Sequence, residues 1–156
     1  TIASKLKKDD VFQNAKRIMF YFSTGEEVQT KDLILNALAE GKEVVLPYLD
    51  LSLQEIKPSR VRNIGTDLKQ GSYGIMEPKK ERLELVDPST IDLVLVPGLA
   101  FDHAKYRLGR GKGYYDRFLA KLSSKVRTFG LAFDFQILES VPVTELDIPV
   151  HRLFHN

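Results

Sequence analysis

The chain has 156 residues, 43% of them hydrophobic, which suits one continuous core and a single domain over residues 1–156. Its 23 Lys and Arg against 21 Asp and Glu leave a formal charge of +2, so bulk charge favours neither nucleic acid nor an anionic membrane as a partner. The absence of cysteine excludes disulfide scaffolds and thiolate zinc sites, and no apolar run or signal core indicates membrane insertion or secretion. We expect a soluble, cytoplasmic protein.

The first part of the chain has the pattern of a β-α-β unit. Ile2, Leu6 and Phe12 are spaced like the end of a helix that is entered part-way along. We then expect a buried strand at residues 18–22, a helix capped by Thr30 and ended by Gly41, and a strand at residues 44–46. This order predicts a parallel strand pair joined by a right-handed crossover.

The rest of the chain continues the alternation after a weaker stretch. Glycines and prolines interrupt residues 51–88, which predicts hairpins or an excursion from the main sheet. We then expect a strand at 91–96, a glycine-rich loop, a helix at 114–122, a strand at 128–132 and a short helix at 135–138. The fold class predicted is α/β: an open, mostly parallel sheet flanked by helices, Rossmann-like, with three α/β/α layers.

The stretch Arg107–Asp116 follows the apolar strand and leads into a helix, the place where open α/β sheets bind ligands. Its glycines alternate with Arg and Lys, so the backbone can approach a ligand and turn N–H groups toward an anion. Residues 102–127 hold eight basic and two acidic residues, a local charge of +6 in a nearly neutral chain. This composition favours a polyphosphate site, although a solvated turn has similar residues.

Asp116 comes directly after the basic residues. Magnesium that bridges ATP phosphates usually takes one or two carboxylates from the protein, so Asp116 is a candidate metal ligand. The loop is not a Walker A motif, because no Gly-Lys pair is followed by Ser or Thr, and its glycine spacing differs from the Rossmann fingerprint.

Several motifs occur together along the chain: Lys16–Ile18, Glu26–Thr30, Gly41-Lys42, Tyr73–Pro78, Val96–Asp102, Arg107–Leu119, and Val141–Val143 with Asp147. In this order they resemble the 5-formyltetrahydrofolate cyclo-ligase (5,10-methenyltetrahydrofolate synthetase) family. The resemblance covers nearly the whole chain. It implies ATP-driven, Mg²⁺-dependent ring closure of 5-formyltetrahydrofolate to 5,10-methenyltetrahydrofolate, with release of ADP and phosphate.

The resemblance also implies roles for individual residues. ATP as co-substrate would be held by Arg107, Leu108, Gly109, Arg110, Gly111, Lys112, Gly113, Tyr114 and Tyr115, of which Arg110, Lys112 and Tyr114 are the catalytic candidates. The folate would contact Phe22, Glu27 and Arg110–Tyr114, and Asp116 and Asp147 would hold Mg²⁺.

Other interpretations remain open at these positions. Glu27 stands where a helix dipole alone favours an acidic residue, Phe22 could be ordinary core and Asp147 a plain turn residue. Tyr114 and Tyr115 could be core aromatics at a helix start, although one of them could stack on a flat ligand.

Two features depart from the family pattern. The family begins with a helix carrying a basic pair that reaches ATP, whereas Lys5, Lys7 and Lys8 fall too late in the register; we expect a truncated N-terminal helix or weaker ATP binding. His151 stands where the family has an acidic residue. Because His151 and His155 have no third partner, we assign no zinc.

Three functional classes compete. The first is the folate cyclo-ligase, acting as a monomer on small molecules. The second is a related ATP-using enzyme acting on another heterocycle. The third is a non-catalytic module that binds a nucleotide or RNA; because Asp116 would repel phosphate unless a metal intervened, we expect no nucleic-acid partner.

Overall fold

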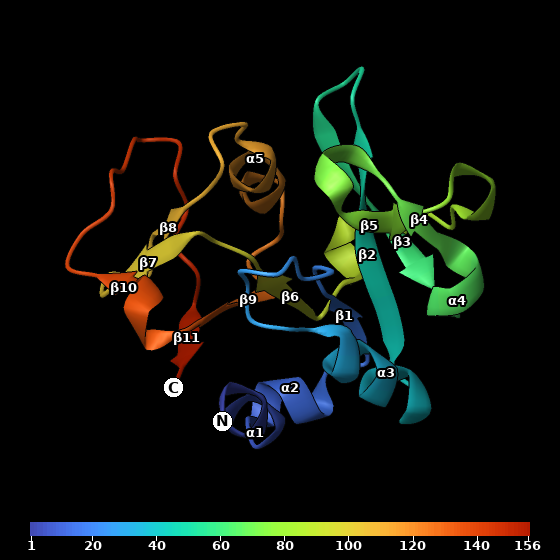
Figure 1. Ribbon diagram of the computed structural model, residues 1–156, viewed down its shortest axis with the longest axis horizontal. Helices are drawn as coiled ribbons and strands as arrows, with labels where there is room; N and C mark the ends of the chain where they lie inside the picture. Colours follow the sequence, from blue (N-terminus) through green and yellow to red (C-terminus); the bar gives the residue numbers. More distant parts are fainter.

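The computed structural model describes residues 1–156 and is built around a six-stranded sheet in the order β11-β9-β6-β1-β2-β3 (Figure 1). Neighbouring strands are parallel except for β2 and β3. The strands are β1 (Arg17–Met19), β2 (Glu43–Asp50), β3 (Glu55–Val61), β6 (Leu93–Val96), β9 (Arg127–Ala132) and β11 (Arg152–His155). The expected open and mostly parallel sheet is confirmed.

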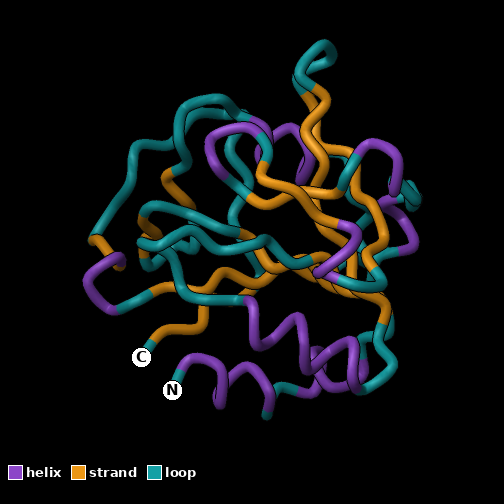
Figure 2. The backbone as a smooth tube through the Cα atoms, turned by 45° about the vertical axis from the view of Figure 1, so that its right-hand side comes forward, coloured by secondary structure: helices purple, strands orange, loops and turns teal.

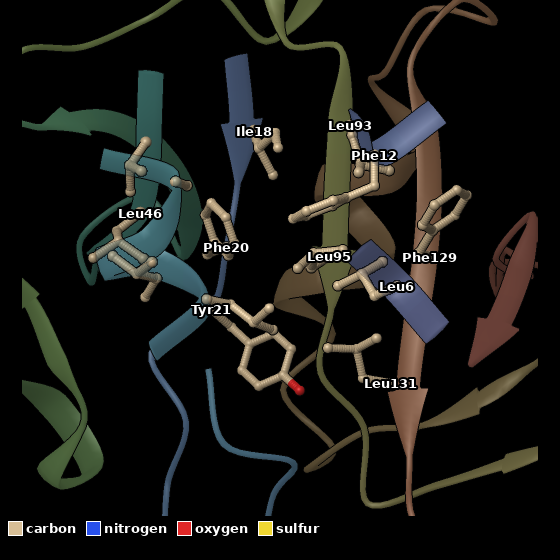
Figure 3. Close-up of a cluster of buried hydrophobic side chains, with 14 of the residues drawn as sticks. Leu6, Phe12, Ile18, Phe20, Tyr21, Leu46, Leu93, Leu95, Phe129 and Leu131 are labelled. Atoms are coloured by element: carbon tan, nitrogen blue, oxygen red, sulfur yellow. The ribbon is translucent and has the colours of Figure 1, made fainter. Parts of the chain in front are cut away.

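Helices cover both faces of this sheet, which confirms the three layers. They are α1 (Ile2–Lys7), α2 (Asp10–Asn14) and α3 (Lys31–Ala39) on one face and α5 (Tyr114–Ala120) on the other. Figure 3 shows Phe12 beside Ile18 and Leu93 of the sheet, and Leu6 beside Leu95 and Leu131. The alternate strand residues, among them Met19 and Val94, pack with α5 instead. Burial on both faces explains the unbroken apolar runs of these strands.

Shorter elements lie outside the main sheet. The hairpin of β4 (Leu68–Gln70) and β5 (Met76–Pro78) follows α4 (Ile64–Asp67), and the third sheet contains β7 (Ala100–Asp102), β8 (Arg107–Leu108) and β10 (Ile137–Leu138). Single 3₁₀ turns span residues 72–74, 80–82, 88–90 and 134–136. The hairpins expected over residues 51–88 are confirmed as β2–β3, whose tip projects from the molecule, and β4–β5 (Figure 2). No helix is both long and apolar enough to cross a membrane.

Some predicted boundaries are wrong. The strand predicted at 18–22 ends at Met19, because the chain bends away after Phe20 donates its N–H to the Val45 carbonyl oxygen at 2.9 Å. The helix predicted at 135–138 is a 3₁₀ turn at 134–136, after which Ile137 and Leu138 pair with β7 as a strand. Strand pairing with residues distant in sequence decides both outcomes, and local hydrophobic periodicity does not predict such pairing.

Thr30 precedes α3 but does not cap it with its side chain. The buried hydroxyl donates to the Tyr21 carbonyl oxygen at 2.6 Å and accepts from the Ser23 N–H at 3.1 Å. Thr30 therefore ties together the two ends of the loop that follows β1. Gly41 does end the helix, with φ of +81°, as predicted.

Candidate functional site

A pocket of about 750 Å³ opens at the carboxyl ends of β1, β2 and β6. In the strand order, β1 is flanked by β2 on one side and β6 on the other, so this is the point at which the chain's direction across the sheet reverses. Its 25 lining residues come from the loop after β1, the end of β2, residues 72–77, residues 97–99, the stretch Arg107–Asp116 and residues 142–147. The volume and the mixture of apolar and charged walls are typical of small-molecule sites.

The glycine-rich loop forms one wall of this pocket, as expected. Gly111 and Gly113 have φ values of +91° and +72°, which side-chain-bearing residues rarely adopt. These turns expose Arg110 and Lys112, and neither side chain forms an ion pair or hydrogen bond within the chain. Their charges are thus free to meet an anion in the pocket.

Arg107 differs from the other two cations, because its side chain is only 8% exposed. Its Nε donates to the Pro97 carbonyl oxygen at 2.9 Å, and its Nη1 lies 3.4 Å from Asp116 Oδ1. The guanidinium also lies 5.3 Å from the centre of the Tyr115 ring. Arg107 therefore connects the end of β6, the base of the loop and the first turn of α5.

Arg117 fastens the other end of the loop. Its Nη1 donates to the Lys112 carbonyl oxygen at 2.9 Å, and its Nη2 donates to the Gln54 carbonyl oxygen at the tip of the β2–β3 hairpin at 2.7 Å. The guanidinium also lies 5.3 Å from the centre of the Tyr114 ring. The sequence did not indicate this role, because an arginine on a helix surface has no distinctive pattern.

Asp116 and Asp147 line the same pocket although 31 positions separate them in sequence. Burial raises the pKa of Asp116, the Arg107 charge lowers it, and the Asp147 charge raises it again. Asp147 also closes a turn, where one of its oxygens accepts from the Thr144 N–H at 2.8 Å. No cluster of three or more His, Cys, Asp or Glu side chains could hold a metal by itself. Two neighbouring carboxylates fit Mg²⁺, which keeps several waters and takes further oxygens from a bound phosphate.

Phe22 and Glu27 lie in the loop after β1 and both line the pocket. Phe22 is half-buried against the core. Glu27 Oε1 accepts hydrogen bonds from the backbone N–H and the hydroxyl of Thr24, at 2.8 and 3.0 Å. The carboxylate thus closes its own turn, a role that neither the helix-dipole interpretation nor the family resemblance anticipated.

The pocket also contains residues that the sequence predictions missed, chiefly Glu77 on β5. Its side chain is buried, and burial raises the pKa of its carboxyl. Leu49 and Tyr73 join it on this wall. The Tyr73–Pro78 motif contains Glu77 and Tyr73 and was the one sequence signal for them, whereas Leu49 belongs to no motif.

Other charged residues considered from the sequence lie elsewhere. Lys5 donates to the His155 carbonyl oxygen at 2.7 Å, and neither Lys7 nor Lys8 lines the pocket. His151 precedes β11 and His155 is its last residue, so the two do not share a helix turn. The Nδ1 of His151 lies 2.9 Å from the Thr128 N, and the Nδ1 of His155 lies 2.9 Å from Asp134 Oδ1.

Known proteins are similar to this chain in sequence and in fold. The sequence model of the 5-formyltetrahydrofolate cyclo-ligase family matches residues 1–155. A probable 5-formyltetrahydrofolate cyclo-ligase of Caenorhabditis elegans is 32% identical over 99% of this chain and 79% of its own length, and the mouse 5-formyltetrahydrofolate cyclo-ligase is 32% identical over 99% and 80%.

A solved structure is also similar to this chain. The NMR structure of 5,10-methenyltetrahydrofolate synthetase from Aquifex aeolicus is 38% identical, covers 99% of this chain and 75% of its own, and superposes with a TM-score of 0.83. With the family match over residues 1–155, this likeness shows that the chain belongs to the 5-formyltetrahydrofolate cyclo-ligase family.

Proposed function

We propose that the chain converts 5-formyltetrahydrofolate and ATP to 5,10-methenyltetrahydrofolate, ADP and phosphate. The observation that carries this proposal is one pocket in which the basic glycine loop, a pair of aspartates and the Phe22–Glu27 loop meet. A polyphosphate and a flat heterocycle need these two different kinds of wall, and family membership supports the pairing.

The chemistry explains why both substrates must lie in one pocket. The formyl oxygen is a poor leaving group until it takes the γ-phosphoryl group of ATP, which leaves ADP. The N10 amine of the folate then attacks the activated formyl carbon, the carbon–oxygen bond breaks, phosphate departs with that oxygen, and N10 loses its proton. The protein must mainly align the reactants and stabilise charge on the phosphoryl group.

Each wall has a role in this proposal. Arg110 and Lys112 neutralise the ATP phosphates, while the backbone of the loop and Tyr114 lie against both reactants. Arg107 acts mainly by holding the loop, because its guanidinium is buried and already hydrogen-bonded. Phe22 packs on the folate ring, and Glu27 accepts hydrogen bonds from it.

Asp116 and Asp147 would hold Mg²⁺ in this proposal. The ion supplies charge neutralisation for the ATP phosphates. Burial is the main cause of the raised pKa of Asp116, and the Asp147 charge adds to it; a cation bound between the two carboxylates would offset both effects.

The test is turnover by the purified protein. With ATP, Mg²⁺ and 5-formyltetrahydrofolate, we expect a product that absorbs in the near ultraviolet, and no product when any one component is omitted. Turnover of a different formylated heterocycle, with none of 5-formyltetrahydrofolate, would redirect the proposal to another substrate. Nucleotide binding that does not respond to Mg²⁺, without turnover, would contradict it.

A further inference from the structure

Glu77 is a buried carboxylate on a wall of the pocket to which no role has yet been assigned. Glu77 is 9% exposed and lies on β5. The Glu77 carboxylate fits against the β4–β5 connection because residue 71 is a glycine. A Cβ atom added at Gly71 would lie 2.2 Å from Glu77 Oε1. Any larger residue at position 71 would have to displace the carboxylate.

Glu77 has no ion pair with a Lys, Arg or His side chain, although Lys69 stands opposite it in the β4–β5 register. Burial raises the pKa of the Glu77 carboxyl, offset in part by the Leu49 backbone amide and the charge of Lys69. A carboxylate held this way is costly unless it is hydrogen-bonded. A ligand that supplies N–H donors would relieve that cost on binding.

Glu27, the other carboxylate available to a heterocycle, is already engaged. Its Oε1 accepts two hydrogen bonds from Thr24, so part of its capacity closes the turn. The reduced folate ring carries N–H donors on its 2-amino group, on N3 and on N8, more than one carboxylate satisfies. An approaching phosphate, by contrast, would be repelled by Glu77.

On the basis of the proposed function, we propose that Glu77 is a second carboxylate that binds the N–H edge of the folate heterocycle, beside Glu27. The folate ring then lies between β5 and the loop after β1. The basic loop is left to the phosphates. The main competing occupant of this wall is the adenine base of ATP, which also carries an amino group.

Equilibrium binding measured by calorimetry tests this without requiring turnover. Glu77→Gln is compared with Glu81→Gln, an exposed residue four positions along. We expect Glu77→Gln to weaken binding of 5-formyltetrahydrofolate about tenfold, the loss typical of a charged hydrogen bond, and to change MgATP binding less than about twofold. Unchanged folate binding, or a loss confined to MgATP, would overturn the inference.

Two further measurements separate ligand contact from a structural effect. Gly71→Ala keeps the carboxyl group but displaces it, and should also weaken folate binding selectively. A substrate analogue without the 2-amino group should reduce the penalty of Glu77→Gln; an equal penalty with both ligands would argue against contact. Folate binding without turnover in the unaltered protein would contradict the proposed function alone, whereas no folate binding at all would contradict both.

Discussion

Two walls of the pocket carry opposite charges and hold them differently. The basic wall, residues 107–113, presents Arg110 and Lys112 to solvent, and it is secured by Arg107 at its base and by Arg117 at the Lys112 carbonyl oxygen. The acidic wall consists of Glu27 and Glu77. The Glu27 carboxylate closes a turn, and the Glu77 carboxylate packs against the backbone at Gly71. An exposed cation costs little before the ligand arrives, whereas the buried Glu77 carboxylate becomes favourable when donors reach it.

Under the proposed function, this difference suits the two walls to different ligands. Phosphate groups bind by replacing water with charged side chains, and exposed Arg and Lys side chains can adjust as the phosphate oxygens change position during a reaction. A rigid heterocycle is better recognised by acceptors that are already in place. The substitutions below are ordered from the largest expected effect to the smallest.

Asp116→Asn should have the largest effect. It removes one of the two carboxylates proposed to hold Mg²⁺, where the basic wall meets α5, and we expect kcat/KM to fall about 100-fold or more. The exposed Asp10→Asn substitution is the matched control and should leave turnover unchanged. If Asp116→Asn is as active as the unaltered protein at saturating Mg²⁺, Asp116 is not a ligand of the ion.

Lys112→Ala should weaken the basic wall itself. Losing one charged contact to phosphate should raise the KM for ATP about tenfold in steady-state assays. Lys125→Ala, an exposed lysine outside the pocket, should not change it. If the two variants have equal KM values for ATP, the exposed cations of the loop do not bind the nucleotide.

Arg117→Ala should loosen the same wall without removing a ligand contact. Losing the bonds to the Lys112 and Gln54 carbonyl oxygens should lower the free energy of unfolding by about 1 kcal/mol and kcat by a few-fold. Denaturant unfolding and turnover should be compared with Arg82→Ala, an exposed arginine without an ion pair. A normal kcat would show that the loop does not need this fastening.

The smallest effect is expected for Glu77→Gln in the acidic wall, as a change in the free energy of unfolding. The raised pKa of Glu77 means that the folded chain binds more protons than the unfolded chain between the unfolded pKa and the higher folded one. Stability therefore falls as pH rises through this window and stays lower above it. Glu77→Gln should remove this pH dependence and unfold with a free energy about 1 kcal/mol higher at neutral pH. Lower stability at neutral pH would show that the charge stabilises the fold.

The fold could be predicted wherever burial dictated the residue pattern. The apolar runs of β2, β6 and β9 lie in a sheet covered on both faces, and Gly41 ends its helix as expected. Predictions failed where a distant partner decided the structure. Thr30 bonds back to Tyr21 instead of capping α3, and Ile137 and Leu138 pair with β7.

The site shows the same division. The basic wall could be predicted because its glycines and cations are contiguous in sequence, whereas the acidic wall combines a turn after β1 with a strand about fifty residues later. Nor does every motif residue serve the ligand. Asp102 is buried and accepts from the N–H groups of Tyr106 and Val141, which secures the β7–β8 turn.

The assignment of the two walls is tested most directly by measuring both dissociation constants in two variants. Lys112→Ala should weaken MgATP at least about five times more than 5-formyltetrahydrofolate, and Glu77→Gln should show the reverse ratio. If both variants weaken the same ligand, or each weakens both ligands equally, the two walls do not serve different substrates and the account is wrong.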